Sequence, residues 1–184
     1  MTSGAVEALI GAHVRDVADY PSPGILFKDI TPLLGDAAAF AAVVDALVDH
    51  HPTGTVDKIV GIEARGFILA APVAYRLRAG FVPMRKKGKL PYLTFESSYA
   101  LEYASATLEV HRDAFAPGDR VLIVDDVLAT GGTAVAALDL VEQAGATAVG
   151  MSFLIELSAL GGRATLGRSP THLPADDVRA LFVV

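Results

Sequence analysis

The residues best suited to chemistry are two adjacent acids, Asp125 and Asp126, and the short loop 129–133 that follows them. The loop reads Ala-Thr-Gly-Gly-Thr, so no bulky side chain prevents its backbone N–H groups from wrapping a tetrahedral anion. A helical pattern begins where the loop ends, and its positive N-terminus would point at the same anion. Ionised carboxylates only accept hydrogen bonds, which suits sugar hydroxyls. Together these residues indicate a sugar phosphate as ligand.

An apolar run over 121–124 leads into the two acids and is short enough to be a buried parallel strand. Because adjacent strand residues point to opposite faces, we expect both acids to reach one ligand only at the end of this strand. Open α/β sheets bind ligands at that position. The loop 129–133 is neither a P-loop, which needs a Lys-Ser/Thr pair after its glycines, nor the G-x-G-x-x-G dinucleotide fingerprint.

The rest of the chain alternates between helical and extended patterns. Apolar spacing predicts helices over 6–19, 36–50, 66–78 and 133–143, and strands over 25–30, 58–62, 80–84, 107–111, 148–157 and 178–184. This alternation predicts a single α/β domain with a central, mostly parallel sheet flanked by helices. Residues 86–105 show no sustained period, and a structureless stretch of this length is usually a lid or binding loop, or else a wrong assignment. For the tail 168–184 we expect an edge strand or a cover for a dimer surface.

Composition narrows the class of protein. The 184 residues are 52% hydrophobic with a net charge of −6, which predicts a folded domain that does not bind nucleic acid nonspecifically. Without cysteine the chain has no disulfide, thiolate metal site or cysteine nucleophile. Neither a membrane span nor a secretory signal is evident, so we expect a cytoplasmic protein without a membrane partner. The basic run 85–89 is equally well explained as a solvated loop or an anion site.

Residues 121–133 are similar to the phosphoribosyl pyrophosphate signature of the type I phosphoribosyltransferases. Four further stretches, in the order of that family, narrow the resemblance to its adenine-specific members: 23–32, 61–67, 85–91 and 99–103. The resemblance covers about residues 20–162. It implies the type I phosphoribosyltransferase fold, with a small base-binding hood that includes about residues 1–35 and a flexible catalytic loop over about 86–105.

The resemblance also implies how phosphoribosyl pyrophosphate binds. The loop 129–133 would hold its 5′-phosphate, the two acids its ribose hydroxyls, and basic side chains its pyrophosphate, partly from the neighbouring subunit of a homodimer. The implied ligands are Arg65, Arg85, Lys86, Lys89, Asp125, Asp126, Ala129, Thr130, Gly131, Gly132 and Thr133. Mg²⁺ would bind mainly substrate oxygens and water, without a protein metal site. Glu63-Ala64 resembles the strained peptide of the family, so we expect a non-proline cis bond there.

For the base, the resemblance implies that Phe27 stacks on adenine while the backbone groups of Leu26 and Lys28 read its Watson–Crick edge. The implied catalytic residues are Arg65 and Glu102. Glu102 is the candidate for handling the purine proton at N7 or N9. Closure of its loop would keep water from the oxocarbenium-like centre that forms at C1′.

The expected activity is purine salvage: adenine and phosphoribosyl pyrophosphate would give AMP and pyrophosphate. One alternative is the same transfer to hypoxanthine, guanine or xanthine, against which residues 23–32 argue. Another is a phosphoribosyl pyrophosphate-sensing regulator without catalysis. An acidic chain with no room for a nucleic-acid-binding domain argues against a regulator, and so does the presence of Glu102.

Overall fold

The structure is a computed structural model that describes residues 2–100, 105–171 and 173–184. Its strands are β1 (Arg15–Ala18), β2 (Leu26–Asp29), β3 (Lys58–Ile62), β4 (Gly80–Lys86), β5 (Thr94–Ala100), β6 (Ser105–His111), β7 (Arg120–Leu128), β8 (Thr147–Glu156) and β9 (Val178–Val183). Its helices are α1 (Ser3–His13), α2 (Thr31–Gly35), α3 (Ala37–Val48), α4 (Arg65–Leu77), α5 (Gly132–Gln143) and α6 (Gly162–Leu166), with 3₁₀ turns at Ser158–Leu160 and Ala175–Asp177.

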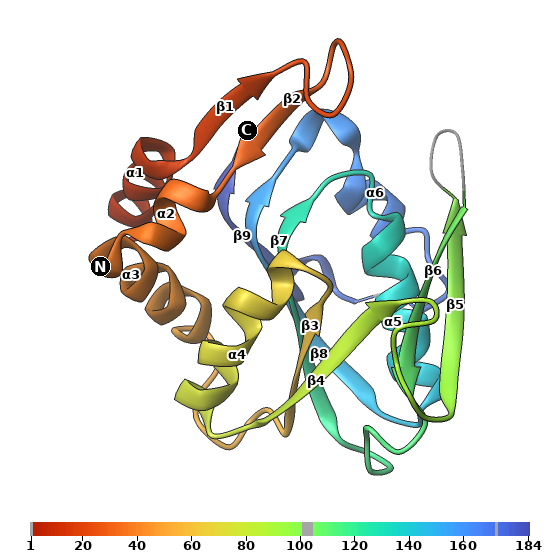
Figure 1. The fold of residues 1–184 in the computed structure, drawn as a ribbon. Coiled ribbons are helices and arrows are strands. Elements are labelled where there is room, and N and C mark those ends of the chain that lie inside the picture. The colour runs from red at the N-terminus through yellow and green to blue at the C-terminus, as the bar shows by residue number, and fades with distance from the viewer. Residues whose placement is uncertain (1, 101–104, 172) are drawn as a thin grey trace.

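Seven of these strands form one sheet in the order β5-β6-β4-β3-β7-β8-β9 (Figure 1). The pairs from β4 through β3, β7 and β8 to β9 are parallel, whereas β5 and β6 add an antiparallel edge. The expected α/β domain with a central, mostly parallel sheet is confirmed. The tail contains β9, which pairs with β8 at the edge of the sheet. Of the two structures expected for the tail, this is the edge strand.

Helices cover both faces of the sheet, and β7 contributes to both cores. Val121 and Ile123 pack with α5 on one face, and Leu122 and Val124 pack with α1, α3 and α4 on the other. All four residues are fully buried. This confirms that the run 121–124 is a buried strand and explains why it is apolar at every position.

The two acids do not stand at the end of β7, so the expectation that they do is wrong. The strand continues to Leu128 because β8 is long enough to pair with Val127 and Leu128. On its other side, however, the pairing with β3 stops at Val124. The acids therefore lie where one neighbouring strand has ended, and the end of β3 leaves them free to line a cavity.

Two further expectations are wrong. The helix expected over 6–19 ends at His13, and Arg15–Ala18 pairs with β2 as an antiparallel hairpin. Ion pairs across this hairpin join Arg15 to Asp29 at 2.6 Å and Lys28 to Asp16 at 2.7 Å. Likewise, the stretch 86–105 is not one continuous loop, because Thr94–Ala100 forms β5. Both strands are held by antiparallel pairing with the strand that follows them, which the apolar periodicity of a single segment does not report.

Candidate active site

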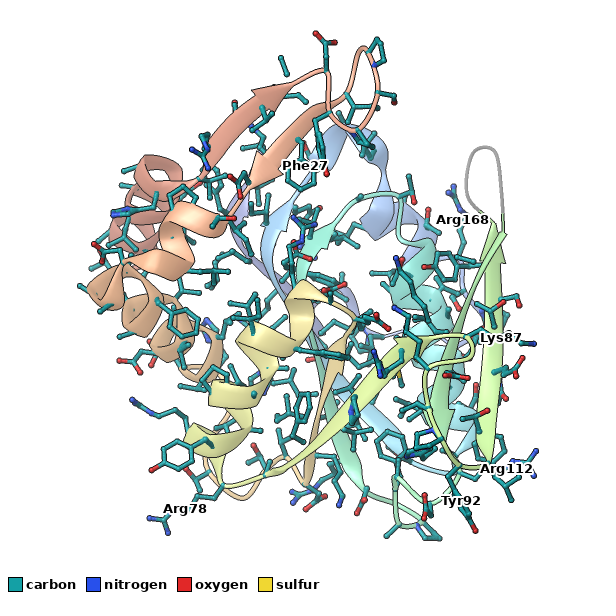
Figure 2. All side chains as sticks on the ribbon, in the orientation of Figure 1. Phe27, Arg78, Lys87, Tyr92, Arg112 and Arg168 are labelled. Atoms are coloured by element: carbon teal, nitrogen blue, oxygen red, sulfur yellow. The ribbon has the colours of Figure 1, made fainter. Side chains whose placement is uncertain are left out.

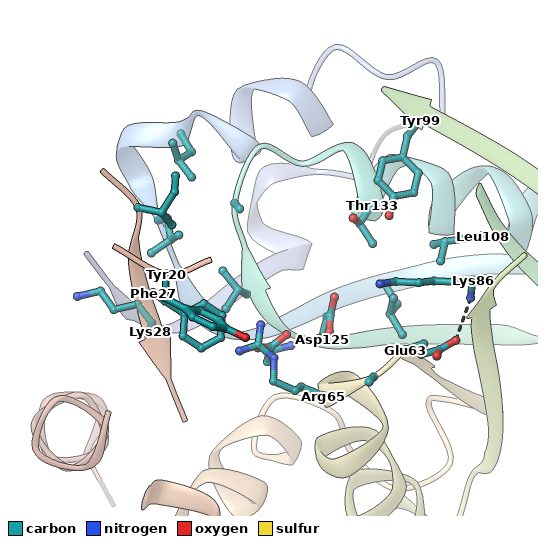
Figure 3. Close-up of a pocket in the computed structure, with 18 of the residues that line it drawn as sticks. Tyr20, Phe27, Lys28, Glu63, Arg65, Lys86, Tyr99, Leu108, Asp125 and Thr133 are labelled. Carbon is teal, nitrogen blue, oxygen red and sulfur yellow. Dashed lines mark hydrogen bonds and ion pairs between the residues drawn. The ribbon is translucent and has the colours of Figure 1, made fainter. Parts of the chain in front are cut away.

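A cavity of about 670 Å³ lies at the carboxyl ends of β3 and β7 (Figure 3). Among the predicted site residues, its lining includes Leu26, Phe27, Lys28, Arg65, Lys86, Asp125, Asp126, Ala129 and Thr133. Thr130 and Gly131 line an adjoining hollow of about 50 Å³ together with Asp125 and Thr133. Gly132 begins α5, and Glu102 lies outside the described residues. Residues from separate motifs thus converge on one cavity.

Arg65 connects the acids to the aromatic side of the cavity. Its Nε lies 2.8 Å from Oδ2 of Asp126, and its Cζ lies 5.0 Å from the centroid of the Phe27 ring. The ring of Phe27 also makes an edge contact with Tyr20, at 5.1 Å between centroids. Figure 3 shows these three side chains grouped beside Asp125. Arg65 therefore covers a face of Phe27 in this structure.

Burial dominates the electrostatics of the acid pair. It raises the pKa of Asp125 well above the usual range, and the neighbouring Asp126 raises it further. Burial also raises the pKa of Asp126, although the Arg65 guanidinium opposes this shift. Ionising a buried carboxylate costs free energy, and hydroxyl donors of a ligand or a neighbouring cation stabilise its ionised form.

The loop 129–133 adopts a curved conformation that only glycine permits at its centre. Gly131 has a φ of +88° and serves as the N-cap of α5, so the N-terminus of this helix faces the 50 Å³ hollow. Thr130 and Thr133, whose side chains carry hydroxyl groups, line the same hollow. This arrangement supplies the partial positive charge and hydroxyl donors that a phosphate group requires.

The basic run forms a turn that the carboxylates of Glu63 and Glu109 hold in place. Glu63 accepts hydrogen bonds from Nζ of Lys89 at 2.7 Å, from the N–H of Lys86 at 3.0 Å and from Nε of Arg85 at 3.3 Å. Burial alone would raise the pKa of Glu63, but these donors lower it to about 2. Glu109, only 3% exposed, accepts hydrogen bonds from the N–H groups of Lys89 at 2.8 Å and Leu90 at 2.7 Å.

The basic side chains of this turn therefore point to different places. Lys86 lines the cavity, whereas Arg85 and Lys89 bind Glu63, which itself lines the cavity. Lys87 points outward and pairs with Glu96 at 2.7 Å, while Phe27 points inward from β2 (Figure 2). The basic run is thus neither purely solvated nor wholly inside the cavity. The peptide bond between Glu63 and Ala64 is cis, as expected.

Sequence reasoning missed several residues of the cavity and its support. Leu157 and Leu160 line it, as do Tyr20 and Tyr99, and Glu63 and Glu109 fix the basic turn. A signal was available for Glu63, which stands inside a recognised motif. Leu160 offered a weaker one, as a large apolar residue directly before two glycines. In the part of the chain that the structure describes, no helix is long and apolar enough to cross a membrane.

The chain is similar to known proteins over most of its length. Residues 33–164 match the family described as phosphoribosyl transferase domain. Adenine phosphoribosyltransferase from Acidothermus cellulolyticus is 70% identical over 184 residues, which is 100% of both chains. The enzyme of that name from Nocardioides is 60% identical over 171 residues, covering 91% of each chain.

Solved structures give the same result. A crystal structure of adenine phosphoribosyltransferase from Rhodothermus marinus is 49% identical, covers 98% of this chain and 99% of its own, and has a TM-score of 0.89. The enzyme from Saccharomyces cerevisiae, complexed with adenine and an imino-altritol bisphosphate, is 37% identical with a TM-score of 0.87. The comparison covers 97% of this chain and 99% of the yeast chain.

Proposed function

The chain belongs to the phosphoribosyltransferase family, and from that premise we propose that it transfers the phosphoribosyl group of phosphoribosyl pyrophosphate to adenine. The products are AMP and pyrophosphate, and the reaction is purine salvage. The observation that carries this proposal is the convergence of an anion-binding loop, an acid pair, basic side chains and an aromatic ring on one cavity. The relative from Acidothermus cellulolyticus, which matches the chain over its full length, bears the name of this activity.

Each part of phosphoribosyl pyrophosphate has a proposed position. The 5′-phosphate occupies the hollow formed by 129–133, and the ribose hydroxyls donate to Asp125 and Asp126. Pyrophosphate binds Arg65 and Lys86, and it draws Arg85 and Lys89 away from Glu63. The reaction is then driven by positioning and by positive charge at the departing pyrophosphate.

The base binds between the hairpin and the far wall of the cavity. We propose that adenine stacks on Phe27 after Arg65 has left the ring, with Leu157 and Leu160 on the opposite side. Backbone groups of Leu26 and Lys28 read the Watson–Crick edge, and the β1–β2 hairpin is part of the hood. Polar groups that must find a matching edge discriminate strongly among purines.

Mg²⁺ is the proposed cofactor, and it supplies charge neutralisation for pyrophosphate when bound. The donors in the cavity fit such an ion, because Mg²⁺ prefers hard oxygen ligands and keeps several waters. The ribose and pyrophosphate oxygens of the substrate, together with water, would hold the ion, and the carboxylates of Asp125 and Asp126 would add negative charge to the same cavity without forming a protein metal site.

Glu102→Gln tests the proposed handling of the purine proton, which we assign to a catalytic loop within 86–105. We expect kcat to fall about a hundredfold. General acid–base catalysis contributes about 10²- to 10⁴-fold to the rate, and in the variant a water molecule takes over part of the proton transfer. Single-turnover measurement of AMP formation isolates this step from product release. The matched control is Glu96→Gln, on β5, where the native side chain pairs with Lys87. An unchanged kcat for the Glu102 variant would remove this role.

A direct assay tests the whole proposal. Purified protein is supplied with phosphoribosyl pyrophosphate, Mg²⁺ and one base at a time, and pyrophosphate release is measured. Release with adenine is the expected result. Release only with hypoxanthine, guanine or xanthine would move the base specificity, and tight binding without release would identify a sensor instead.

We also propose that the protein is a homodimer in the cytoplasm. Three large apolar side chains on α4 and β4 are exposed in the single chain: Ile68, Tyr75 and Phe81. Their burial between two copies would remove apolar surface from water. Light scattering at micromolar concentration should give twice the chain mass, and a single-chain mass would contradict the dimer.

A further inference from the structure

Gly162 brings two walls of the cavity into direct backbone contact. It begins α6, which lies beside the loop leading from β7 into α5 (Figure 1). A Cβ atom at Gly162 would overlap the carbonyl oxygen of Ala129 and would lie 2.9 Å from Cδ1 of Leu128. From the other side, a Cβ atom at Gly131 would lie 2.7 Å from the carbonyl oxygen of Gly162. Only two glycines allow these backbones to approach so closely.

The segment that Gly162 closes is also fixed to β7 and β9 at its other end. The N–H of Leu157 donates to the carbonyl of Leu128 at 2.9 Å. Both the N–H and the hydroxyl of Ser158 donate to the carbonyl of Val184 at 2.8 Å. Next to Gly162, Arg163 holds the buried Glu156 through Nη2 at 2.7 Å. The wall carrying Leu157 and Leu160 is therefore rigidly attached to the strand that leads into 129–133.

We propose that Gly162 is a positioning residue that sets the loop 129–133 at the distance needed to hold the 5′-phosphate. This inference rests on the proposed function. Ala129 is the first residue of the loop, and its carbonyl packs on the Cα of Gly162, so any side chain at 162 must push the loop. Displacement of the backbone by a few tenths of an ångström misaligns several N–H groups at once. Hydrogen bonds to charged groups weaken steeply with such misalignment.

The matched pair Gly162→Ala and Gly167→Ala tests this inference. Both positions lie at ends of α6, and Gly167 has an ordinary φ of −66°. A Cβ atom there would approach nothing closer than 3.6 Å. We expect Gly162→Ala to weaken AMP binding about tenfold to a hundredfold, equivalent to one or two charge-assisted hydrogen bonds. Adenosine lacks the phosphate, so its affinity should change less than threefold. Gly167→Ala should bind both ligands like the parent protein.

Isothermal titration calorimetry measures these affinities without turnover. If the parent protein fails to bind AMP, the proposed function fails. If the parent binds AMP and Gly162→Ala binds it equally well, the inference about Gly162 is overturned while the function stands. Equal losses for AMP and adenosine would also overturn it, because they would indicate general distortion of the cavity.

A second variant separates the contact with the Ala129 carbonyl from the contact with Leu128. It also keeps the inference testable if Gly162→Ala folds poorly. Leu128→Val combined with Gly162→Ala removes the leucine methyl that the new Cβ would meet, but leaves the Ala129 carbonyl in place. We expect the double variant to fold more stably than Gly162→Ala in thermal unfolding and still to lose AMP affinity. Recovery of AMP affinity would place the defect in the core and overturn the inference.

Discussion

Arg65→Gln should lower kcat/KM for phosphoribosyl pyrophosphate by about 10²- to 10³-fold. Removing one hydrogen-bond donor that stabilises the charge of a transition state has an effect of this size in other enzymes. Arg65 is the cation that stands closest to the acid pair, with its Nε 2.8 Å from Asp126. We expect it to move to the departing pyrophosphate, whose negative charge grows as the bond to C1′ breaks. Glutamine can donate a hydrogen bond but cannot supply the charge.

The control for this variant is Arg76→Gln, on the same helix. Arg76 pairs with Asp45 at 2.8 Å, but both side chains are about half exposed, at 53% and 50%. Exposed pairs contribute little, so activity and stability should stay close to those of the parent protein. Steady-state kinetics with saturating adenine provides the comparison. A loss below threefold for Arg65→Gln would contradict its catalytic role.

The second large effect is expected from the acid pair. Replacing both Asp125 and Asp126 by asparagine should lower kcat/KM for phosphoribosyl pyrophosphate by about 10²- to 10³-fold, because hydrogen bonds to charged acceptors are the stronger kind. The KM for adenine, measured with saturating phosphoribosyl pyrophosphate, should change little. The exposed Asp113, changed to asparagine, is the control. If the double variant keeps its affinity for phosphoribosyl pyrophosphate, the ribose hydroxyls bind elsewhere.

The same pair predicts a pH dependence. Burial raises both pKa values in the folded protein, so kcat/KM for phosphoribosyl pyrophosphate should fall as the pH drops through these raised values. For stability the sign is opposite. A raised pKa means that the folded state binds the proton more tightly than the unfolded chain does, so the cost of the buried charges is relieved as the pH falls. The difference in unfolding free energy between the parent protein and the double variant should therefore shrink in acid.

The sequence predicted best what depends on neighbouring residues. The buried strand at 121–124 and the cis bond after Glu63 follow from local pattern or recognised motif, and both are confirmed. The strand at Arg15–Ala18 was missed because its partner is β2, held across the hairpin by ion pairs. Glu109 was missed for a similar reason. Its carboxylate accepts hydrogen bonds from the backbone N–H groups of Lys89 and Leu90, about twenty residues earlier in the chain. The roles proposed for individual site residues, Glu102 among them, stay predictions.

The position of Arg65 over Phe27 has a thermodynamic consequence. Adenine and the guanidinium compete for one aromatic face, while pyrophosphate and Asp126 compete for one cation. Binding of phosphoribosyl pyrophosphate that draws Arg65 away uncovers Phe27, so each substrate should raise the affinity for the other by the same factor. The two substrates are then cooperative ligands within a single chain, with one side chain carrying the coupling. Adenine affinity measured with and without a non-reactive phosphoribosyl pyrophosphate analogue gives that factor.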